Sequence, residues 1–470
     1  MSVSPRRHAA RTLSGAALLL FAAACSETDL AGPAVADVDV PLVGAFDMSG
    51  DPATGRHLVM FKGQGPANFA QTVADLGGTV EFSHPIGIAI VSGLDAAGAT
   101  ALAGTKGIGD VQADESFQMD DQLGSAEDAG AIVASPSDPT TASRYSRQWN
   151  LPAIGANVAW AAGRLGSSAV TVAILDSGVD PVHPDLAGRV DASRSFSYVP
   201  SDDALVDAFF PGAPYWIDLR YHGTHVAATV ASNALAAAGV TSGTTLISVK
   251  VCNVNGSCPF SSVIAGVLHA ADNGAQVANM SLGGGFTKAG NGRFVGFINQ
   301  VFNYARSRGV TMVVAAGNSA LDLDHNGNTF TSYCDVNVIC VSATGPTSGG
   351  TTGPWPDADT PAVYTNFGRS AISVAAPGGN TGASVWAACS TFSLVVPVCR
   401  TGVFILGISG TSMATPHVAG LAALLVEDYG ANPGRIRGRI QATADDLGQR
   451  GTDPFYGKGR INVPAALGLN

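Results

Sequence analysis

Residues 169–178 read "AVTVAILDSG", an apolar run that ends on Asp176 and a turn-forming Ser-Gly pair. Further apolar runs of this kind follow along the chain, and segments with helical periodicity separate them. Short buried strands that alternate with helices are typical of a parallel sheet covered by helices on both faces, so the sequence predicts an α/β fold. The other runs lie at 243–251, 277–284, 309–318, 337–344 and 371–378, and helices are expected near 222–236, 261–273, 295–308 and 412–428.

The composition narrows the class of protein. The chain has 470 residues, which exceeds the usual size of one hydrophobic core, so more than one structural unit is expected. Its formal net charge is -11 and it contains no block of like charges, which argues against a nucleic-acid partner. Beyond the N-terminal signal described next, no run approaches the ~18 apolar residues that a membrane span needs.

The first 25 residues have the pattern of an export signal. Three arginines precede the apolar stretch "LSGAALLLFAAAC", and a site of small residues follows it. The end of the stretch, "FAAACS", resembles a bacterial lipobox, although Ala22 stands where leucine is usual. Cys25 is therefore either a lipid anchor or part of a signal removed by ordinary signal peptidase. In both cases the protein is exported, to the medium or to the cell envelope, and contacts a membrane only through that anchor.

The remaining cysteines indicate disulfides. Apart from Cys25 the sequence has six of them, an even number in an exported chain. Six cysteines allow 15 connectivities, but short loops favour pairing within each close couple. A zinc site is the alternative, and it lacks both a CxxC motif and histidines at ligand spacing. The couples are Cys252 with Cys258, Cys334 with Cys340, and Cys389 with Cys399.

Residues ahead of the α/β region form a second pattern. Between 56 and 116 the periodicity predicts β-α-β-β-α-β, which is the order of a small ferredoxin-like α+β domain. Residues 117–148 are polar and without a period, so we expect an exposed linker that is easily cut.

Three polar residues at the ends of predicted strands and helices are the candidate catalytic residues. Asp176 ends a buried strand, His222 opens the helix of "YHGTHVAATVAS", and Ser412 stands in "GISGTSMATPHVAG". A serine hydroxyl becomes a nucleophile only when a base such as histidine accepts its proton and a carboxylate orients that base. Taken alone, an aspartate or histidine at such a position is more often structural. Together they predict an Asp-His-Ser triad.

The stretches "AILDSGVD", "HGTHVAATVAS" and "GTSMATPHVAG" resemble the three active-site signatures of the subtilisin-like serine peptidases, in the same chain order. This resemblance covers about 149–470 and implies a subtilisin-like fold and an acyl-enzyme mechanism. It also implies that Ser281, Leu282 and Gly283 pair with an extended peptide. Asn318 of "VVAAGNS" would stabilise the oxyanion, whereas without the motif it would be taken for a turn residue.

The same resemblance implies that the small domain is an inhibitory propeptide of the inhibitor I9 type. The precursor would then process itself, and its own propeptide would be an intramolecular inhibitor. The divisions expected on this basis are a signal peptide at 1–25, a flexible linker at 26–52, the propeptide at 53–117, a linker with the processing site at 118–148, and the catalytic domain at 149–470.

The sequence also gives expectations about cofactors and substrate specificity. The chemistry requires no cofactor. Asp322, Asp324 and Asn326 alternate as at the start of a calcium loop, but Tyr333 stands where such a loop has glutamate, which favours a solvated polar turn over a calcium site. Glycines in the segments expected to line the pocket favour broad cleavage after large apolar residues of protein or peptide substrates. We expect a monomer.

Two other functions are to be weighed against this one. A binding protein on an inactive peptidase scaffold would have no need of all four functional positions. The related acid peptidases use a glutamate base, where this chain has His222. Ser409, His225, His417 and His183 are expected to be structural.

Overall fold

The computed structural model describes residues 55–63, 65–119, 122–132, 137–283, 286–288, 292–327, 329–330 and 333–469, all within one unit, Gly50–Asn470. The expected signal peptide at 1–25, with Cys25, and the linker at 26–52 lie outside the described residues.

A four-stranded antiparallel sheet with two helices forms the N-terminal region, as the periodicity predicts. The sheet order is β2-β3-β1-β4. Val59 packs with the two helices, whereas its neighbours Leu58 and Met60 belong to the core that includes Phe260. Alternate residues of a strand point to opposite faces, so this sheet contacts its own helices on one face and the larger domain on the other. The elements are β1 (Arg56–Phe61), α1 (Phe69–Asp75), β2 (Thr79–His84), β3 (Ile88–Ser92), α2 (Ala96–Ala103) and β4 (Ile108–Ala113).

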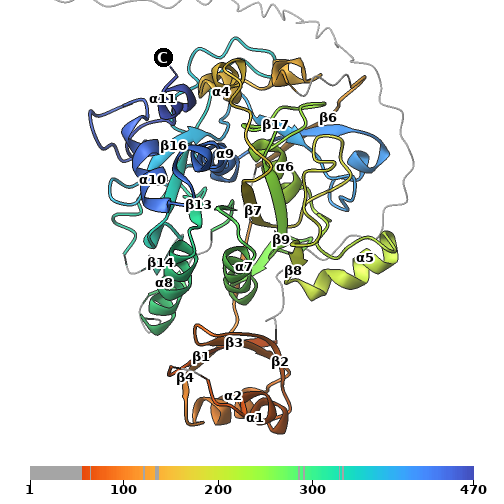
Figure 1. The fold of residues 1–470 in the computed structure, drawn as a ribbon, viewed down its shortest axis with the longest axis vertical. Coiled ribbons are helices and arrows are strands. Elements are labelled where there is room, and N and C mark those ends of the chain that lie inside the picture. The colour runs from red at the N-terminus through yellow and green to blue at the C-terminus, as the bar shows by residue number, and fades with distance from the viewer. Residues whose placement is uncertain are drawn as a thin grey trace, which may run out of the picture. The chain divides into compact units, whose positions relative to one another are not determined.

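The larger domain is built on a seven-stranded sheet in the order β16-β15-β13-β11-β7-β9-β8 (Figure 1). Every pairing in it is parallel, which confirms the predicted α/β class. The strands are β7 (Thr171–Asp176), β8 (Phe196–Ser197), β9 (Thr245–Lys250), β11 (Val277–Met280), β13 (Thr311–Ala315), β15 (Ile339–Thr344) and β16 (Val374–Pro377).

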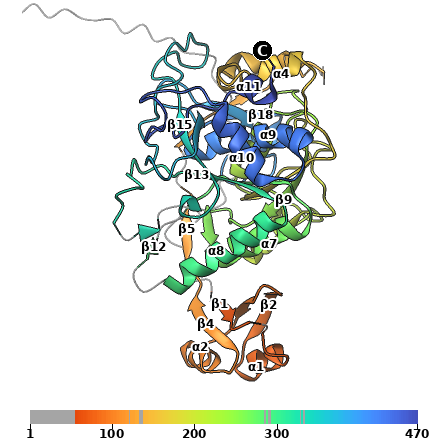
Figure 2. The same ribbon diagram turned by 60° about the vertical axis from the view of Figure 1, so that its left-hand side comes forward.

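Helices cover both faces of this sheet (Figures 1 and 2). In β7, Val172 and Ile174 pack into one core, while Ala173 and Leu175 pack into another. Every residue of β7 is buried, which is why its sequence reads as one apolar run rather than an alternating one. The first core includes α6 (His222–Val230), α9 (Thr411–Tyr429) and α10 (Pro433–Ala442), and the second includes α7 (Phe260–Asp272) and α8 (Gly292–Ser307).

Smaller elements complete the domain. Three small sheets pair β10 with β5, β12 with β14, and β17 with β18 and β6. The strands are β5 (Ser116–Gln118), β6 (Gln122–Asp128), β10 (Ser257–Pro259), β12 (Phe286–Thr287), β14 (Thr329–Phe330), β17 (Val385–Ala388) and β18 (Phe404–Ser409). The short helices are α3 (Asn150–Ala153), α4 (Ala156–Ala161), α5 (Asp203–Phe209) and α11 (Val463–Leu467), and the 3-10 turns are η1 (Pro139–Thr141), η2 (Tyr145–Arg147), η3 (Pro200–Asp202), η4 (Tyr333–Asp335) and η5 (Pro397–Thr401).

The segment 118–148, for which the sequence predicted an exposed linker, contains a strand and two 3-10 turns. Residues 122–128 form β6, which pairs antiparallel with β18 of the catalytic domain, and two 3-10 turns follow. Its sequence, "QLGSAED", has no apolar alternation because backbone pairing with β18, rather than side-chain burial, holds it in place.

The three disulfides join neighbouring cysteines, as the short loops favoured. Cys252 pairs with Cys258, Cys334 with Cys340, and Cys389 with Cys399. These sulfurs are therefore not zinc ligands, and the described residues contain no group of three side chains placed to hold a metal. None of the helices described is both long and apolar enough to cross a membrane.

Candidate active site

Asp176 and His222 form a buried pair at the carboxyl end of the sheet. Asp176 is the last residue of β7, and His222 is the first residue of α6. The Nδ1 atom of His222 lies 2.7 Å from Oδ1 of Asp176, and both side chains are fully buried. With the carboxylate as acceptor, Nδ1 carries the proton, so the lone pair of the ring lies on Nε2. This is the tautomer that a general base requires.

Asp218 fixes the two elements that carry this pair. Its carboxylate accepts the backbone N-H and the hydroxyl of Thr224 in the first turn of α6, at 2.9 and 2.7 Å. It also accepts the hydroxyl of Ser177, the residue after Asp176, at 2.9 Å. Burial is the main cause that raises the pKa of Asp218. The sequence analysis missed this residue, although a carboxylate four positions before His222 at a helix start is a signal that it could have used.

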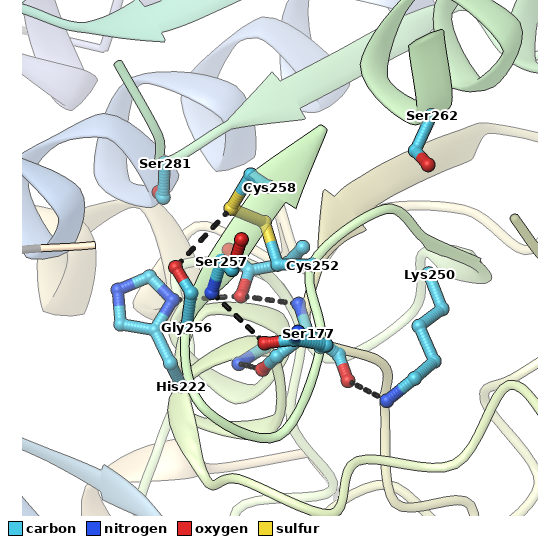
Figure 3. Close-up of a disulfide and its surroundings, with 12 residues drawn as sticks. Ser177, His222, Lys250, Cys252, Gly256, Ser257, Cys258, Ser262 and Ser281 are labelled. Carbon is cyan, nitrogen blue, oxygen red and sulfur yellow. Dashed lines mark hydrogen bonds and ion pairs between the residues drawn. A yellow bond between two sulfur atoms is a disulfide. The ribbon is translucent and has the colours of Figure 1, made fainter. Parts of the chain in front are cut away.

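Lys250 supports the same turn from the neighbouring strand. It lies beside Asp176 in the β7-β9 register, and its side chain is fully buried. Its Nζ donates to the carbonyl of Ser177 at 2.8 Å, as Figure 3 shows, and forms an ion pair with Asp202 at 2.9 Å. A buried lysine needs such partners, and here they hold the backbone that follows Asp176. Sequence reasoning missed Lys250 because it lies at the end of an ordinary apolar run.

Ser412 opens α9 beside the end of β11. Its hydroxyl donates to the carbonyl oxygen of Ser281 at 3.1 Å, and the hydroxyl of Ser281 donates back to the carbonyl of Ser412 at 2.6 Å. This reciprocal pair joins the start of α9 to the segment after β11. The side chain of Ser412 is thereby held at the carboxyl end of β11.

Asn318 is oriented by Thr411, the residue before Ser412. Its Oδ1 accepts both the backbone N-H and the hydroxyl of Thr411, each at 2.8 Å. The hydroxyl of Thr411 in turn accepts the N-H of Gly317 at 3.0 Å. Because Oδ1 is committed to Thr411, the side-chain amide of Asn318 faces away from Thr411 as a hydrogen-bond donor.

A cavity of about 660 Å³ adjoins Ser412, Asn318 and Thr411. Asn318 and Ser412 line it, and the predicted substrate segment Ser281–Gly283 lines it as well. Residues 117–119, which follow the small N-terminal domain, also line this cavity. The chain's own N-terminal segment is therefore placed beside Ser412.

Strand β10 pairs with the segment 116–118, which leads into the cavity. Phe117 lies opposite Cys258 in the antiparallel β5-β10 register, and the N-H of Met119 donates to the carbonyl of Gly256 at 2.9 Å. The disulfide from Cys252 to Cys258 closes the loop that carries Gly256 (Figure 3). Sequence reasoning did not predict β10, although its Asn-Gly pair between two close cysteines is a signal of a tight, cross-linked turn.

The N-terminal domain is attached chiefly through α7 and α8. The Asp114 carboxylate accepts the N-H of Ser261 at 2.9 Å in the first turn of α7. His84 lies 2.9 Å from the carboxylate of Asp272 at the other end of that helix. Gln300 of α8 donates to the carbonyl of Ile86 at 2.7 Å.

The other polar residues of the motifs lie in structural positions. His417 is buried between the Met413 carbonyl and the Asn150 side chain, at 2.8 Å from each, and burial lowers its pKa to about 4. His225 contacts the carbonyls of Val385 and Leu406 and so joins β17 to β18. The nitrogens of His183 contact the Phe404 carbonyl and the Asp185 backbone, and Ser409 contacts Ser384.

The loop considered for calcium does not fit that ion well. The oxygens of Asp322 bond to the N-H of Asp324 at 3.0 Å and to the ring of His325 at 2.8 Å. The carboxylate of Asp324 accepts the N-H of Ser370. Calcium takes six to eight oxygen ligands, and these carboxylates are already used by donors of the chain. Asn326 lines the active-site cavity instead.

A buried Asp-His pair and a serine at a helix start, on a parallel sheet covered on both faces, define an α/β serine hydrolase. The model of the subtilase family matches residues 167–459, more than half of the chain, and the protein belongs to that family. It is therefore a subtilisin-like serine endopeptidase that acts on protein or peptide substrates, and the alternative of a binding protein is not supported.

Named relatives agree with this assignment. The chain is 33% identical over 344 residues to thermitase of Thermoactinomyces vulgaris, which covers 71% of this chain and 99% of thermitase. It is 33% identical over 324 residues to subtilisin Savinase of Lederbergia lenta. That match covers 68% of this chain and 97% of subtilisin Savinase.

Solved structures share the fold. Fervidolysin from Fervidobacterium pennivorans, a keratinolytic enzyme, is 25% identical with a TM-score of 0.63, covering 88% of this chain and 61% of that one. The epidermin leader peptide processing protease of Staphylococcus aureus has a TM-score of 0.66 at 21% identity. That match covers 88% of this chain and 98% of the Staphylococcus aureus protein.

Proposed function

We propose that peptide hydrolysis proceeds through Ser412 as nucleophile, His222 as general base and Asp176 as the group that orients His222. The observation that carries this assignment is the buried 2.7 Å contact between Asp176 and His222, which sets the tautomer a base needs. The hydroxyl of Ser412 attacks the carbonyl carbon while Nε2 of His222 takes its proton. The same proton then passes to the leaving amine, and water releases the acyl-enzyme by the reverse path.

Asn318 is proposed to stabilise the negative oxygen of the tetrahedral intermediate. Its orientation by Thr411 supports this role, because the amide donor is fixed before substrate arrives. A preorganised donor pays no reorganisation cost as the charge develops. The backbone N-H of Ser412 at the start of α9 is the second proposed donor.

The proposed substrate is an extended peptide bound in the same cavity. β10 pairs with residues 116–118, and residues 117–119 line the same cavity as Ser281–Gly283. Backbone pairing of this kind tolerates many sequences, so we expect broad specificity. Gly283 and the open cavity favour large apolar side chains before the cleaved bond.

We further propose that residues 53–117 are an inhibitory propeptide and that the enzyme cuts its own precursor between Met119 and Gln122. Residues 116–119 lie against β10 and its adjoining turn, and residues 117–119 line the active-site cavity, as a peptide substrate would. Residues 120 and 121 lie outside the described residues. The bond that is cut is one of the three that join Met119 to Gln122.

Export is proposed from the signal at 1–25. If Cys25 carries a lipid, cutting after Met119 frees the catalytic domain from the membrane, because the anchor stays on the propeptide side. Detergent partitioning of the processed, active enzyme tests this: an enzyme that remains lipid-bound contradicts it.

The catalytic assignment is tested with Ser412→Ala and the matched control Ser409→Ala, three residues earlier in the same motif. We expect Ser412→Ala to abolish turnover of a chromogenic peptide and to accumulate as uncut precursor. Ser409→Ala should be processed and active. Processing or turnover by Ser412→Ala at the wild-type rate would refute the proposal.

A further inference from the structure

We propose that β6 stays on β18 after the precursor is cut and acts as a tethered inhibitor of the mature enzyme. It would cover the primed side of the cleft, meaning the side that binds the residues after the cleaved bond. The inference rests on the proposed function, since it requires a cut between Met119 and Gln122. It goes beyond it by adding a second inhibitory segment that the propeptide's departure does not remove.

The direction of the chain places β6 on the primed side. Residues before the cut pair with β10, and Gln122 pairs with Ser409, three residues before Ser412. Met119 lines the same cavity as Ser412, Gln122 pairs with Ser409, and three Cα-Cα steps span at most ~11 Å, so the described residues on both sides of the cut lie near Ser412. After the cut, β5 leaves with the propeptide, whereas β6 remains covalently joined to the catalytic domain.

Ion pairs that survive the cut anchor the far end of β6. Glu127 accepts Nε and Nη2 of Arg147, each at 3.0 Å, and lies 3.0 Å from Nε of Arg144. Arg144 also donates to the carbonyl of Asp128 at 2.6 Å. About a quarter of each of these three side chains is exposed, at 23–28%, so the charges are partly shielded from solvent. Both arginines lie downstream of the cut and stay with the catalytic domain.

The backbone of β6 fits β18 closely. Pairs run from Gln122 opposite Ser409 to Asp128 opposite Phe404, with an irregularity between Leu406 and Ile408. At that irregularity a side chain on Gly124 would lie only 2.5 Å from the carbonyl oxygen of Gly407. The two strands can approach in this way only because residue 124 is glycine.

A tethered strand competes effectively with substrate. β6 covers the edge of the β17-β18 sheet, so a substrate that extends past the cleaved bond must displace it before pairing there. A short tether keeps the local concentration of β6 high, on the order of millimolar. A substrate that ends at the cleaved bond does not need this edge.

The test compares processed wild type, Glu127→Gln and the control Asp428→Asn on two substrates. One is a peptide p-nitroanilide, which has no residues past the cleaved bond, and the other is an internally quenched peptide that continues several residues further. Asp428→Asn removes a surface ion pair with Arg164 near the far end of α9, roughly 24 Å from Ser412 along the helix. Amide hydrogen exchange of residues 122–128 in the processed enzyme gives a second measurement.

We expect Glu127→Gln to raise kcat/KM for the quenched peptide about fivefold and to leave kcat/KM for the p-nitroanilide unchanged. A change of this size corresponds to the loss of one partly shielded ion-pair cluster that holds β6. Residues 122–128 should be protected from exchange in the processed wild type. Equal changes on both substrates, no change on either, or free exchange of 122–128 overturns the inference. Failure of the proposed function looks different: wild type would not turn over the p-nitroanilide, or its mass would place the cut outside Met119–Gln122.

Discussion

The side chain of Asn318 is oriented by hydrogen bonds from Thr411. Its Oδ1 accepts the backbone N-H and the hydroxyl of Thr411, which orients the side-chain amide as a donor on a residue that lines the same cavity as Ser412. At this scale the motifs predicted roles for Asp176, His222, Ser412 and Asn318, and the role of Asn318 was predicted only through the resemblance to the subtilisin-like peptidases.

Replacing Asn318 with alanine should lower kcat by about 10²–10³ with little change in KM, because the donor acts on charge that develops only in the transition state. Steady-state kinetics on a chromogenic peptide measure this. Asn326→Ala, which lines the same cavity, is the control and should keep kcat near that of wild type. A loss seen mainly in KM would argue that Asn318 binds substrate instead.

His417 should make stability depend on pH. Its pKa is lowered by burial from 6.5 to about 4 in the folded state. The unfolded chain therefore takes up a proton near pH 6.5 that the folded chain refuses, so this contribution is complete above pH 6.5 and is lost as pH falls toward 4. The loss amounts to roughly 3 kcal/mol at most.

Urea unfolding of Ser412→Ala, which prevents self-digestion, measures this effect at pH 7 and pH 4.5. Adding His417→Gln should remove most of the fall between the two pH values. Adding the exposed control His325→Gln should leave the fall in place. An unchanged fall in the His417→Gln protein would contradict the assignment.

Asp218 and Lys250 show where residue-level prediction stops. Both are buried and help to position the turn after Asp176. A local signal existed for Asp218, which stands four residues before His222 at a helix start. Lys250 stands at the end of an ordinary apolar run, and only the folded chain brings it to its distant partner Asp202.

At the scale of helices and strands, the burial of a strand's side chains determined whether the strand could be predicted from the sequence. Strands such as β7 and β9 are covered on both faces and are therefore apolar along their length. β5, β6 and β10 are short strands outside the main sheet that pair through the backbone, and their polar sequences gave no period. Of these strands, β5 contributes Phe117 and Gln118 to the lining of the active-site cavity.

The disulfide from Cys252 to Cys258 should matter for substrate binding as well as stability. Replacing both cysteines with serine removes a short cross-link worth about 2 kcal/mol and frees the loop that carries Gly256. We expect KM to rise for peptides long enough to pair with β10, while peptides too short to reach it are unaffected.

The double variant Cys334→Ser/Cys340→Ser is the matched control, because its loop has the same separation of six residues. It should lose similar stability in thermal unfolding without the selective change in KM. Equal KM effects in the two double variants would show that β10 is not held by its disulfide.

At the scale of the whole molecule, the sequence predicted an N-terminal α+β domain followed by an α/β domain, and both are present. The contacts that position residues 117–119 in the cleft, such as Asp114 with the start of α7, were not predictable from the sequence. The same is true of the strand order in the large sheet, where neighbours in space such as β7 and β11 are separated by more than a hundred residues.

The most direct test of the account is the site at which a fluorophosphonate probe attaches to the processed enzyme. Peptide mapping by mass spectrometry after labelling at neutral pH should find the adduct on Ser412, and Ser412→Ala should remain unlabelled. An adduct on another serine, or no labelling of processed wild type, would contradict the assignment of Ser412 as the nucleophile.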